Sequence, residues 1–104
     1  MTKTYTIIVG LNDKKTRRQE VSTSDAKRML ADIVLRYSDG ATFTTCEGVY
    51  RHADGGVVFE TSIKVEVFGI TDEEARDICG YAASALNQEY IYKQVNTVES
   101  VDFI

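Results

Sequence analysis

Two short groups of polar side chains are the residues best suited to bind a ligand. Glu60 and Ser62 are two positions apart, so they share a face if residues 57–68 form a strand. Gln88 and Glu89 follow a predicted helix, where the chain enters the last predicted strand. Carboxylate, hydroxyl and amide groups can together hold a polar ligand. A solvated turn and strand surface explains the same residues, and this simpler interpretation is the one that the sequence favours.

Nucleophilic catalysis finds little support in the sequence. His52 is the only histidine, and along a regular strand Cys46 lies roughly 20 Å from it, at ~3.3 Å per residue. That distance is too long for a thiol and its base. Cys79 falls on the apolar stripe of a predicted helix, where a thiol serves as a small apolar side chain. We therefore predict a protein that is not an enzyme and has no catalytic residue, metal site or cofactor.

A basic segment offers a second way to bind a partner. Positive charge is concentrated in Lys14, Lys15, Arg17 and Arg18. Such a group of cations can bind a phosphate or an acidic partner. The surrounding segment, 14–21, fits a solvated loop, which the charge pattern favours, or a short arm that returns to pair with the end of the first strand.

The composition is that of a folded protein with an acidic balance. Of 104 residues, 43% are apolar and 27% charged, and the net charge is -4. The length predicts one domain, 1–104, in which 99–104 forms a C-terminal tail. The acidic balance argues against a general nucleic-acid-binding surface. Two cysteines and one histidine are too few for a four-ligand zinc site from one chain.

The sequence shows no sign of export or of a membrane segment. Its N-terminus lacks the pattern of a signal peptide, and no run approaches the ~20 apolar residues of a membrane helix. We expect a cytoplasmic protein with reduced thiols.

Alternation and helical spacing predict six elements in the order strand, helix, strand, strand, helix, strand. They cover residues 4–11, 26–37, 42–52, 57–68, 71–86 and 90–98. This order predicts a ferredoxin-like α+β sandwich, in which two helices cover one face of a four-stranded antiparallel sheet. Strands 4–11 and 57–68 are expected at the centre of the sheet, and the other two at its edges.

The strand 57–68 has one apolar face and one mostly polar face. The apolar face is expected to build the core: Val57, Phe59, Thr61, Ile63, Val65 and Val67. The opposite face displays Val58, Glu60, Ser62, Lys64, Glu66 and Phe68. It lacks the stacking aromatic and basic residues of RNA-binding sheets, so we do not expect nucleic acid as a partner.

The open face of the sheet and its end provide the candidate ligand- or partner-binding residues. These are Glu60, Ser62, Lys64, Phe68, Gln88 and Glu89. Ile8 and Phe68 also offer apolar surface on this face, and the tail 99–104 ends in apolar residues that can add to an exposed strand edge. We therefore expect a homodimer.

Three segments resemble small uncharacterised proteins of bacterial phages and mobile elements. The resemblance rests on TYTIIVGLND at 4–13, on GVY and DGGVVFETS within 48–62, and on LNQEYI at 86–91. It implies a ferredoxin-like fold and an accessory role, and it supplies no catalytic residues. In that context an inhibitor of a host defence system is a role consistent with a small acidic protein.

The sequence therefore predicts a non-enzymatic accessory protein that acts through protein–protein interaction. The alternative is a dimeric sensor in which Glu60, Ser62, Gln88 or Glu89 holds a small ligand. A third interpretation is a small isomerase or lyase that uses the same polar groups.

Overall fold

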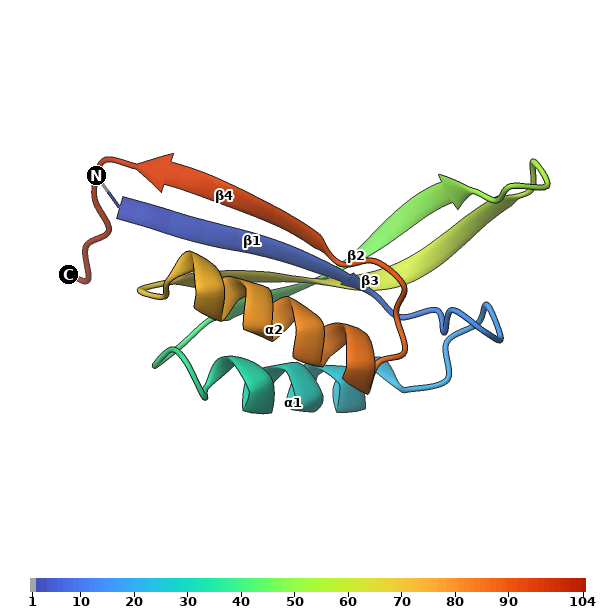
Figure 1. Cartoon of the computed structure of the whole chain (residues 1–104), viewed down its shortest axis with the longest axis horizontal. Helices are drawn as coiled ribbons and strands as arrows, with labels where there is room; N and C mark the ends of the chain where they lie inside the picture. The colour runs from blue at the N-terminus through green and yellow to red at the C-terminus, as the bar shows by residue number, and fades with distance from the viewer. Residues whose placement is uncertain (1) are drawn as a thin grey trace.

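The computed structural model describes residues 2–104, and its elements follow the predicted order. They are β1 (Thr2–Gly10), α1 (Thr23–Val34), β2 (Thr42–Arg51), β3 (Val57–Phe68), α2 (Asp72–Ala85) and β4 (Tyr92–Val98). The strands form one antiparallel sheet in the order β2-β3-β1-β4. Both helices cover the same face of this sheet (Figure 1). The ferredoxin-like α+β fold is therefore confirmed, with β1 and β3 at its centre.

Local sequence signals set where the two helices begin. The Ser22 hydroxyl accepts a hydrogen bond from the Asp25 amide at the start of α1. At the start of α2, Thr71 and Glu74 form a capping box, in which each side chain accepts a hydrogen bond from the other residue's amide. Neither helix is long and apolar enough to cross a membrane, a finding that covers residues 2–104.

The core lies between the sheet and the helices. Its largest fully buried side chains from the sheet are those of Tyr5, Ile7, Val9, Ile63, Val65 and Val67. The helices contribute Ala26, Leu30, Ile33, Val34, Ala75, Ile78 and Ala82. Fully burying one such aliphatic side chain stabilises the fold by about 1.5–3 kcal/mol. This packing fixes the register of β1 against β3, in which Gly10 at the end of β1 pairs with Ser62.

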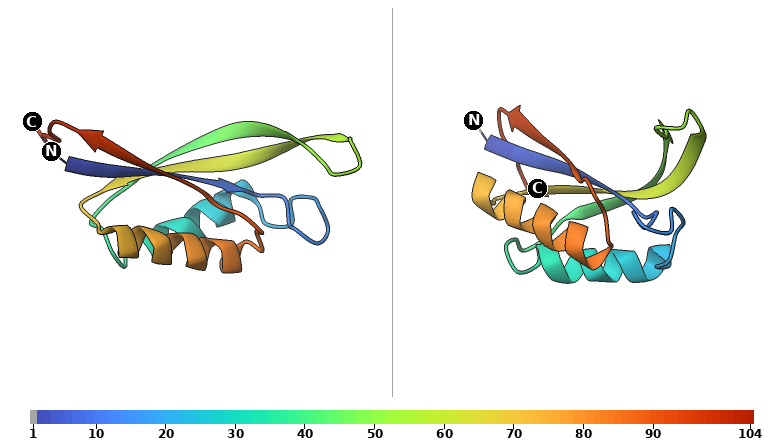
Figure 2. Two further views of the ribbon diagram at one scale, coloured as in Figure 1. Left: turned by 45° about the horizontal axis from the view of Figure 1, so that its top comes forward. Right: turned by 45° about the vertical axis from the view of Figure 1, so that its right-hand side comes forward.

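The strands β2 and β3 continue past the helices as a two-stranded arm, which we call the β2–β3 arm (Figure 2). Phe59 pairs directly with Val49 in this arm. Val57 is 54% exposed and Phe59 65%, whereas Ile63 on the same face is 0% exposed. The prediction that the whole Val57–Val67 face builds the core is therefore wrong for its first half. Alternation identifies the face of a strand, but it carries no information on how far the helices extend beneath it.

The segment after β1 combines the two structures that the sequence left open. Asn12 and Gln19 form a single antiparallel bridge, so the chain returns on itself. Between them the Asp13 carboxylate accepts hydrogen bonds from the amides of Lys15 and Thr16. Arg17 has a positive φ of 63°, which closes the turn. We call residues 13–18 the basic loop.

A buried tyrosine joins the sheet to the start of α2. The Tyr5 side chain is buried, and its hydroxyl donates a hydrogen bond to the Asp72 carboxylate. That bond and the burial raise the pKa of Tyr5 from 10.0 to about 12. The same hydrogen bond, together with Lys3, lowers the pKa of Asp72 below its ordinary 3.8. The free energy of unfolding is therefore expected to depend on pH in the acidic range, through Asp72, and in the alkaline range, through Tyr5.

Tyr5→Phe is expected to remove the alkaline part of this dependence. A raised tyrosine pKa gives stability that is complete below pH 10 and is lost as pH rises toward 12. The wild type should be the more stable protein at neutral pH, and its advantage should shrink between pH 10 and 12. Urea unfolding of both proteins across this range measures the difference. A difference that stays constant with pH would show that the bond to Asp72 does not control the titration of Tyr5.

Candidate functional site

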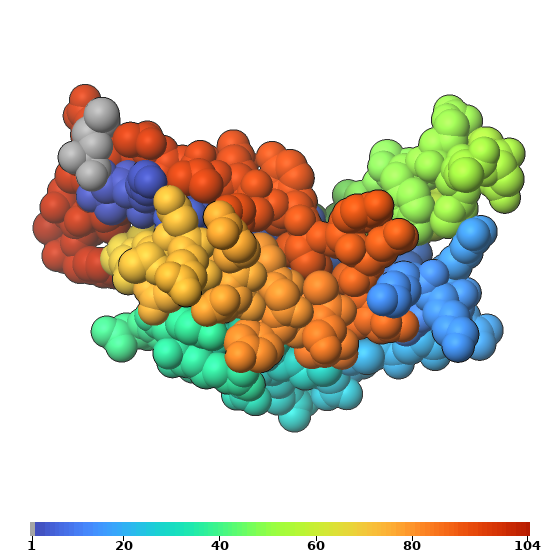
Figure 3. All heavy atoms as spheres, in the orientation of Figure 1, coloured from blue at the N-terminus to red at the C-terminus, as the bar shows by residue number. Residues whose placement is uncertain are grey.

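A cavity of about 390 Å³ lies at the end of the sheet where β1, the β2–β3 arm and the α2–β4 turn meet. Its walls come from segments far apart in the sequence: Asn12, Asp13, Lys14, Arg17, Tyr50, His52, Glu60, Gln88, Glu89 and Tyr90. Figure 3 shows the arm standing out from the body of the molecule above the basic loop. We call this hollow the Glu60 cavity.

The Glu60 carboxylate is positioned by the end of β1 and by the segment that follows it. Its Oε2 accepts a hydrogen bond of 3.0 Å from the Asn12 amide, just after β1 ends. The carboxylate also lies directly over Gly10, where a Cβ would come within 2.7 Å of Oε2. A side chain at position 10 would therefore displace the carboxylate. No hydrogen-bond partner occupies the Glu60 Oε1 atom within residues 2–104.

Three aromatic side chains, those of Tyr50, His52 and Tyr90, line the cavity together with this carboxylate. Tyr50 and His52 both lie on the open face of the arm, and their rings meet edge to face with centroids 5.2 Å apart. Tyr90 contributes a ring from the other side of the cavity and is 82% exposed. Gly48 is the direct partner of Glu60 across the arm, so no side chain covers the strand there. The cavity therefore combines a carboxylate with three aromatic rings in its lining.

Hydrogen bonds fix the basic loop against the turn that follows α2. The Asn87 amide group donates to the Asp13 carboxylate at 2.9 Å, and the Gln88 amide group donates to the Asn12 carbonyl at 2.7 Å. Asn87 has a positive φ of 49°, a conformation that asparagine tolerates. The bond from Asn87, with those from Thr16 and Lys15, lowers the pKa of Asp13. Asp13 is thus a structural anion that holds two walls of the cavity together.

The structure brings some of the sequence candidates together and separates others. Glu60, Gln88, Glu89, Lys14 and Arg17 line one cavity. The others lie elsewhere. Ser62 is buried next to β2, Lys64 forms an ion pair with Glu66, and Phe68 lines the groove at the far end of the sheet. Lys15 and Arg18 are not among the residues that line the cavity.

The sequence does not identify Tyr50 and Tyr90 as ligand-binding residues, and His52 enters there only as a possible base for Cys46. A tyrosine or histidine in a strand is unremarkable until its neighbours are known. The importance of Gly10 follows only from the position of Glu60 in the structure. A signal did exist: the three segments of the resemblance, 4–13, 48–62 and 86–91, all contribute to this cavity.

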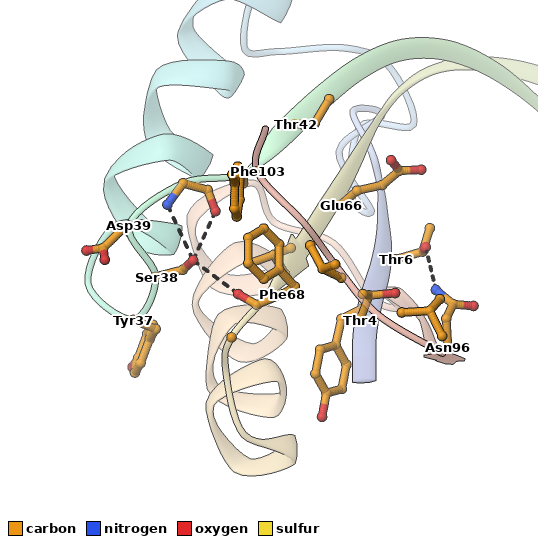
Figure 4. Close-up of a pocket in the computed structure, with 17 residues that line it drawn as sticks. Thr4, Thr6, Tyr37, Ser38, Asp39, Thr42, Glu66, Phe68, Asn96 and Phe103 are labelled. Carbon is orange, nitrogen blue, oxygen red and sulfur yellow. Dashed lines mark hydrogen bonds between the residues drawn. The ribbon is translucent and has the colours of Figure 1, made fainter. Parts of the chain in front are cut away.

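A second and larger groove, of about 950 Å³, lies at the opposite end of the open face (Figure 4). The tail covers part of it, with the Phe103 ring 5.4 Å from that of Phe68. Much of its polar lining is already paired, since Asn96 donates to Thr6 and Ser38 donates to carbonyl groups. We therefore place the candidate site at the Glu60 cavity, where the side chains of Lys14 and Arg17 form no ion pair within residues 2–104 and Glu60 keeps one carboxylate oxygen free of hydrogen bonds.

The arrangement is suited to a cationic ligand that carries a flat ring. A carboxylate such as Glu60 attracts a positive group, and tyrosine rings can stack on a heterocycle or contact a cation. Glu89, from the turn between α2 and β4, adds a second carboxylate to the cavity lining. The cavity volume lies within the range of small-molecule sites, about 300–1,000 Å³.

Comparisons with known proteins give structural neighbours only. No family model matches the chain, and no curated protein sequence matches it. A phage SAM lyase in complex with S-methyl-5'-thioadenosine superposes with a TM-score of 0.69 at 20% identity, covering 91% of this chain and 80% of that chain. CutA from Synechococcus elongatus superposes with a TM-score of 0.60 at 13% identity, covering 93% and 76%.

A third similar structure is a DUF3240 family protein from Shewanella baltica. Its TM-score is 0.58 at 8% identity, with 100% of this chain and 98% of that chain covered. Identities this low show a shared fold. That fold occurs in an enzyme, the phage lyase, and in proteins whose names state no reaction, so the predicted absence of catalysis is not decided by the fold.

Proposed function

We propose that this protein is a lyase that binds S-adenosylmethionine in the Glu60 cavity and releases S-methyl-5'-thioadenosine. The observation that carries the proposal is the Glu60 carboxylate, which lies over Gly10 and lines one cavity together with Tyr50 and Tyr90. S-adenosylmethionine joins a sulfonium cation to an adenine ring, and these are the two groups that a carboxylate and tyrosine rings attract. The structural likeness to a phage SAM lyase supports the same assignment. Of the functions predicted from sequence, this develops the lyase rather than the non-enzymatic role.

The reaction needs no metal or redox partner. The bond between the sulfonium sulfur and the γ carbon of the methionine moiety breaks, and its electron pair stays on sulfur. A neutral thioether, S-methyl-5'-thioadenosine, then leaves. The γ carbon then forms a new bond within its own fragment, by one of two routes. In the first, the α-carboxylate attacks the γ carbon and closes a lactone. In the second, a β C–H bond breaks, its electron pair forms a double bond to the γ carbon, and its proton passes to a base. In this scheme Glu60 binds the cationic substrate and, on the elimination route, is the base that accepts the proton.

The test is to incubate the purified protein with S-adenosylmethionine and to follow S-methyl-5'-thioadenosine by chromatography. We expect the thioether to accumulate in step with substrate loss. Sulfonium compounds also decay slowly in water, so a sample without protein has to run beside it. Binding without faster release would instead support the small-ligand sensor, and neither binding nor release would overturn the proposal.

A second candidate, the predicted interaction role, is favoured by one observation on the β2–β3 arm. Val49, Val57 and Phe59 form an apolar face there that no helix covers. We infer that a second copy of the chain covers this face, which keeps the expected homodimer but moves its surface from the open face to the arm. Light scattering at micromolar concentration that gave 11.6 kDa would contradict it. The inhibition of a host defence system stays a prediction from the resemblance.

A further inference from the structure

Two cations at the rim of the Glu60 cavity are not needed to hold a sulfonium group. Lys14 and Arg17 line the cavity on the side of the basic loop. Among residues 2–104, neither belongs to an ion pair. Arg18, in the same loop, differs from them because its guanidinium group binds Glu20 at 2.9 Å. Lys14 and Arg17 therefore offer unpaired positive charge to whatever enters the cavity.

The backbone of both residues is fixed relative to Glu60. The Lys14 amide donates to the Asn87 carbonyl at 3.0 Å, and the Arg17 amide donates to the Asp13 carbonyl at 2.7 Å. Asp13 is itself bound to Asn87, as described above. The backbone that carries the two cations is thus fixed by hydrogen bonds. Less conformational entropy is therefore lost when an anion binds between them.

The free charges of the cavity form a pattern. Asp13 accepts three hydrogen bonds on its two oxygens, whereas Glu60 accepts one and keeps its Oε1 atom available. The remaining charged groups of the lining are Glu89, Lys14 and Arg17. S-adenosylmethionine carries two cationic groups, the sulfonium and the α-ammonium, and one anion, the α-carboxylate. The two free carboxylates suit the cationic groups. An ammonium and a guanidinium group are the donors that proteins use for a carboxylate.

We propose that Lys14 and Arg17 bind the α-carboxylate of the substrate and so select S-adenosylmethionine over sulfonium compounds that lack a carboxylate. This inference rests on the proposed lyase function. It makes the basic loop a specificity element of the same site. Decarboxylated S-adenosylmethionine, which keeps the sulfonium, the adenosine and the amine, is the probe that separates the two claims.

The experiment measures three constants in each protein: kcat and KM for S-adenosylmethionine, and the inhibition constant of decarboxylated S-adenosylmethionine. The variant is Lys14→Gln with Arg17→Gln. The matched control is Lys15→Gln with Arg18→Gln, which removes the same charge from the same loop but leaves the cavity lining intact. We expect the first variant to raise KM by roughly 10- to 100-fold, because it removes two cations and one charge-assisted hydrogen bond to a carboxylate corresponds to about a factor of ten in affinity. The inhibition constant should stay the same or fall, and the control should match the wild type.

Each other outcome overturns a specific claim. If the wild type releases no thioether, the lyase proposal falls, and this inference falls with it. If the wild type is active and KM does not rise in the first variant, only the role of Lys14 and Arg17 is wrong. If KM and the inhibition constant rise together, the two cations act on every sulfonium ligand and do not recognise the carboxylate. An equal rise in KM in the control would assign the effect to net charge.

Discussion

Replacing Glu60 by glutamine is expected to lower kcat/KM for S-adenosylmethionine by about 10²-fold. Glutamine keeps an oxygen that can accept the Asn12 amide, but it loses the negative charge that attracts the sulfonium group. Steady-state release of S-methyl-5'-thioadenosine gives the value. A rise in KM alone would assign Glu60 to binding the cation, and a fall in kcat would assign it to accepting a proton.

Two further variants decide whether this effect belongs to the site. Glu66→Gln makes the same chemical change on the same strand face, but Glu66 lies in the other groove, paired with Lys64. It should leave kcat/KM unchanged. Gly10→Ala should reduce kcat/KM with Glu60 still present, because a methyl group at position 10 occupies the place of the carboxylate. Full activity in Glu60→Gln or in Gly10→Ala would remove Glu60 from the proposed site.

Truncating Ile63 is expected to have the largest effect on stability. Its side chain is fully buried between the sheet and the helices. Ile63→Ala should lower the free energy of unfolding by about 3 kcal/mol, through lost burial and the cavity that remains. For a domain of this size, that corresponds to a drop in Tm of roughly 10–20 °C. Thermal unfolding followed by circular dichroism measures it.

Phe59→Ala is the matched comparison, because Phe59 lies on the same strand and the same face as Ile63. It should change the free energy of unfolding of the monomer by no more than about 0.5 kcal/mol, as expected for an exposed side chain. If a second copy covers the arm, the loss will grow with protein concentration. Equal, concentration-independent losses in both variants would mean that the core extends into the arm.

The candidate site shows where sequence reasoning stops. The sequence predicts that Glu60, Gln88 and Glu89 belong to one polar ligand-binding group, and in the structure all three line one cavity. Ser62 was grouped with Glu60 because both face the same side of β3, yet Ser62 is buried next to β2. Periodicity gives the direction of a side chain from its strand, but burial depends on what the rest of the chain places over it.

The basic loop illustrates the same limit. The sequence shows the charge of this loop but does not predict its structure. A charged segment with few apolar residues has no hydrophobic periodicity that would indicate a helix or a strand. Its conformation comes from Asp13 and from Asn87, which is distant in sequence. Because these contacts join the two ends of the chain, no local rule predicts which of its cations face the cavity.

The sequence by itself determined the order of the elements, the central place of β1 and β3, and the start of α2. These follow from side-chain periodicity and from capping residues, which act over a few positions. Only the tertiary structure decided that the helices end beneath the middle of β3, leaving the β2–β3 arm uncovered. It also decided that Gly10, Glu60, Tyr90 and the basic loop share one cavity, because strand pairing and hydrogen bonds between distant segments set that proximity.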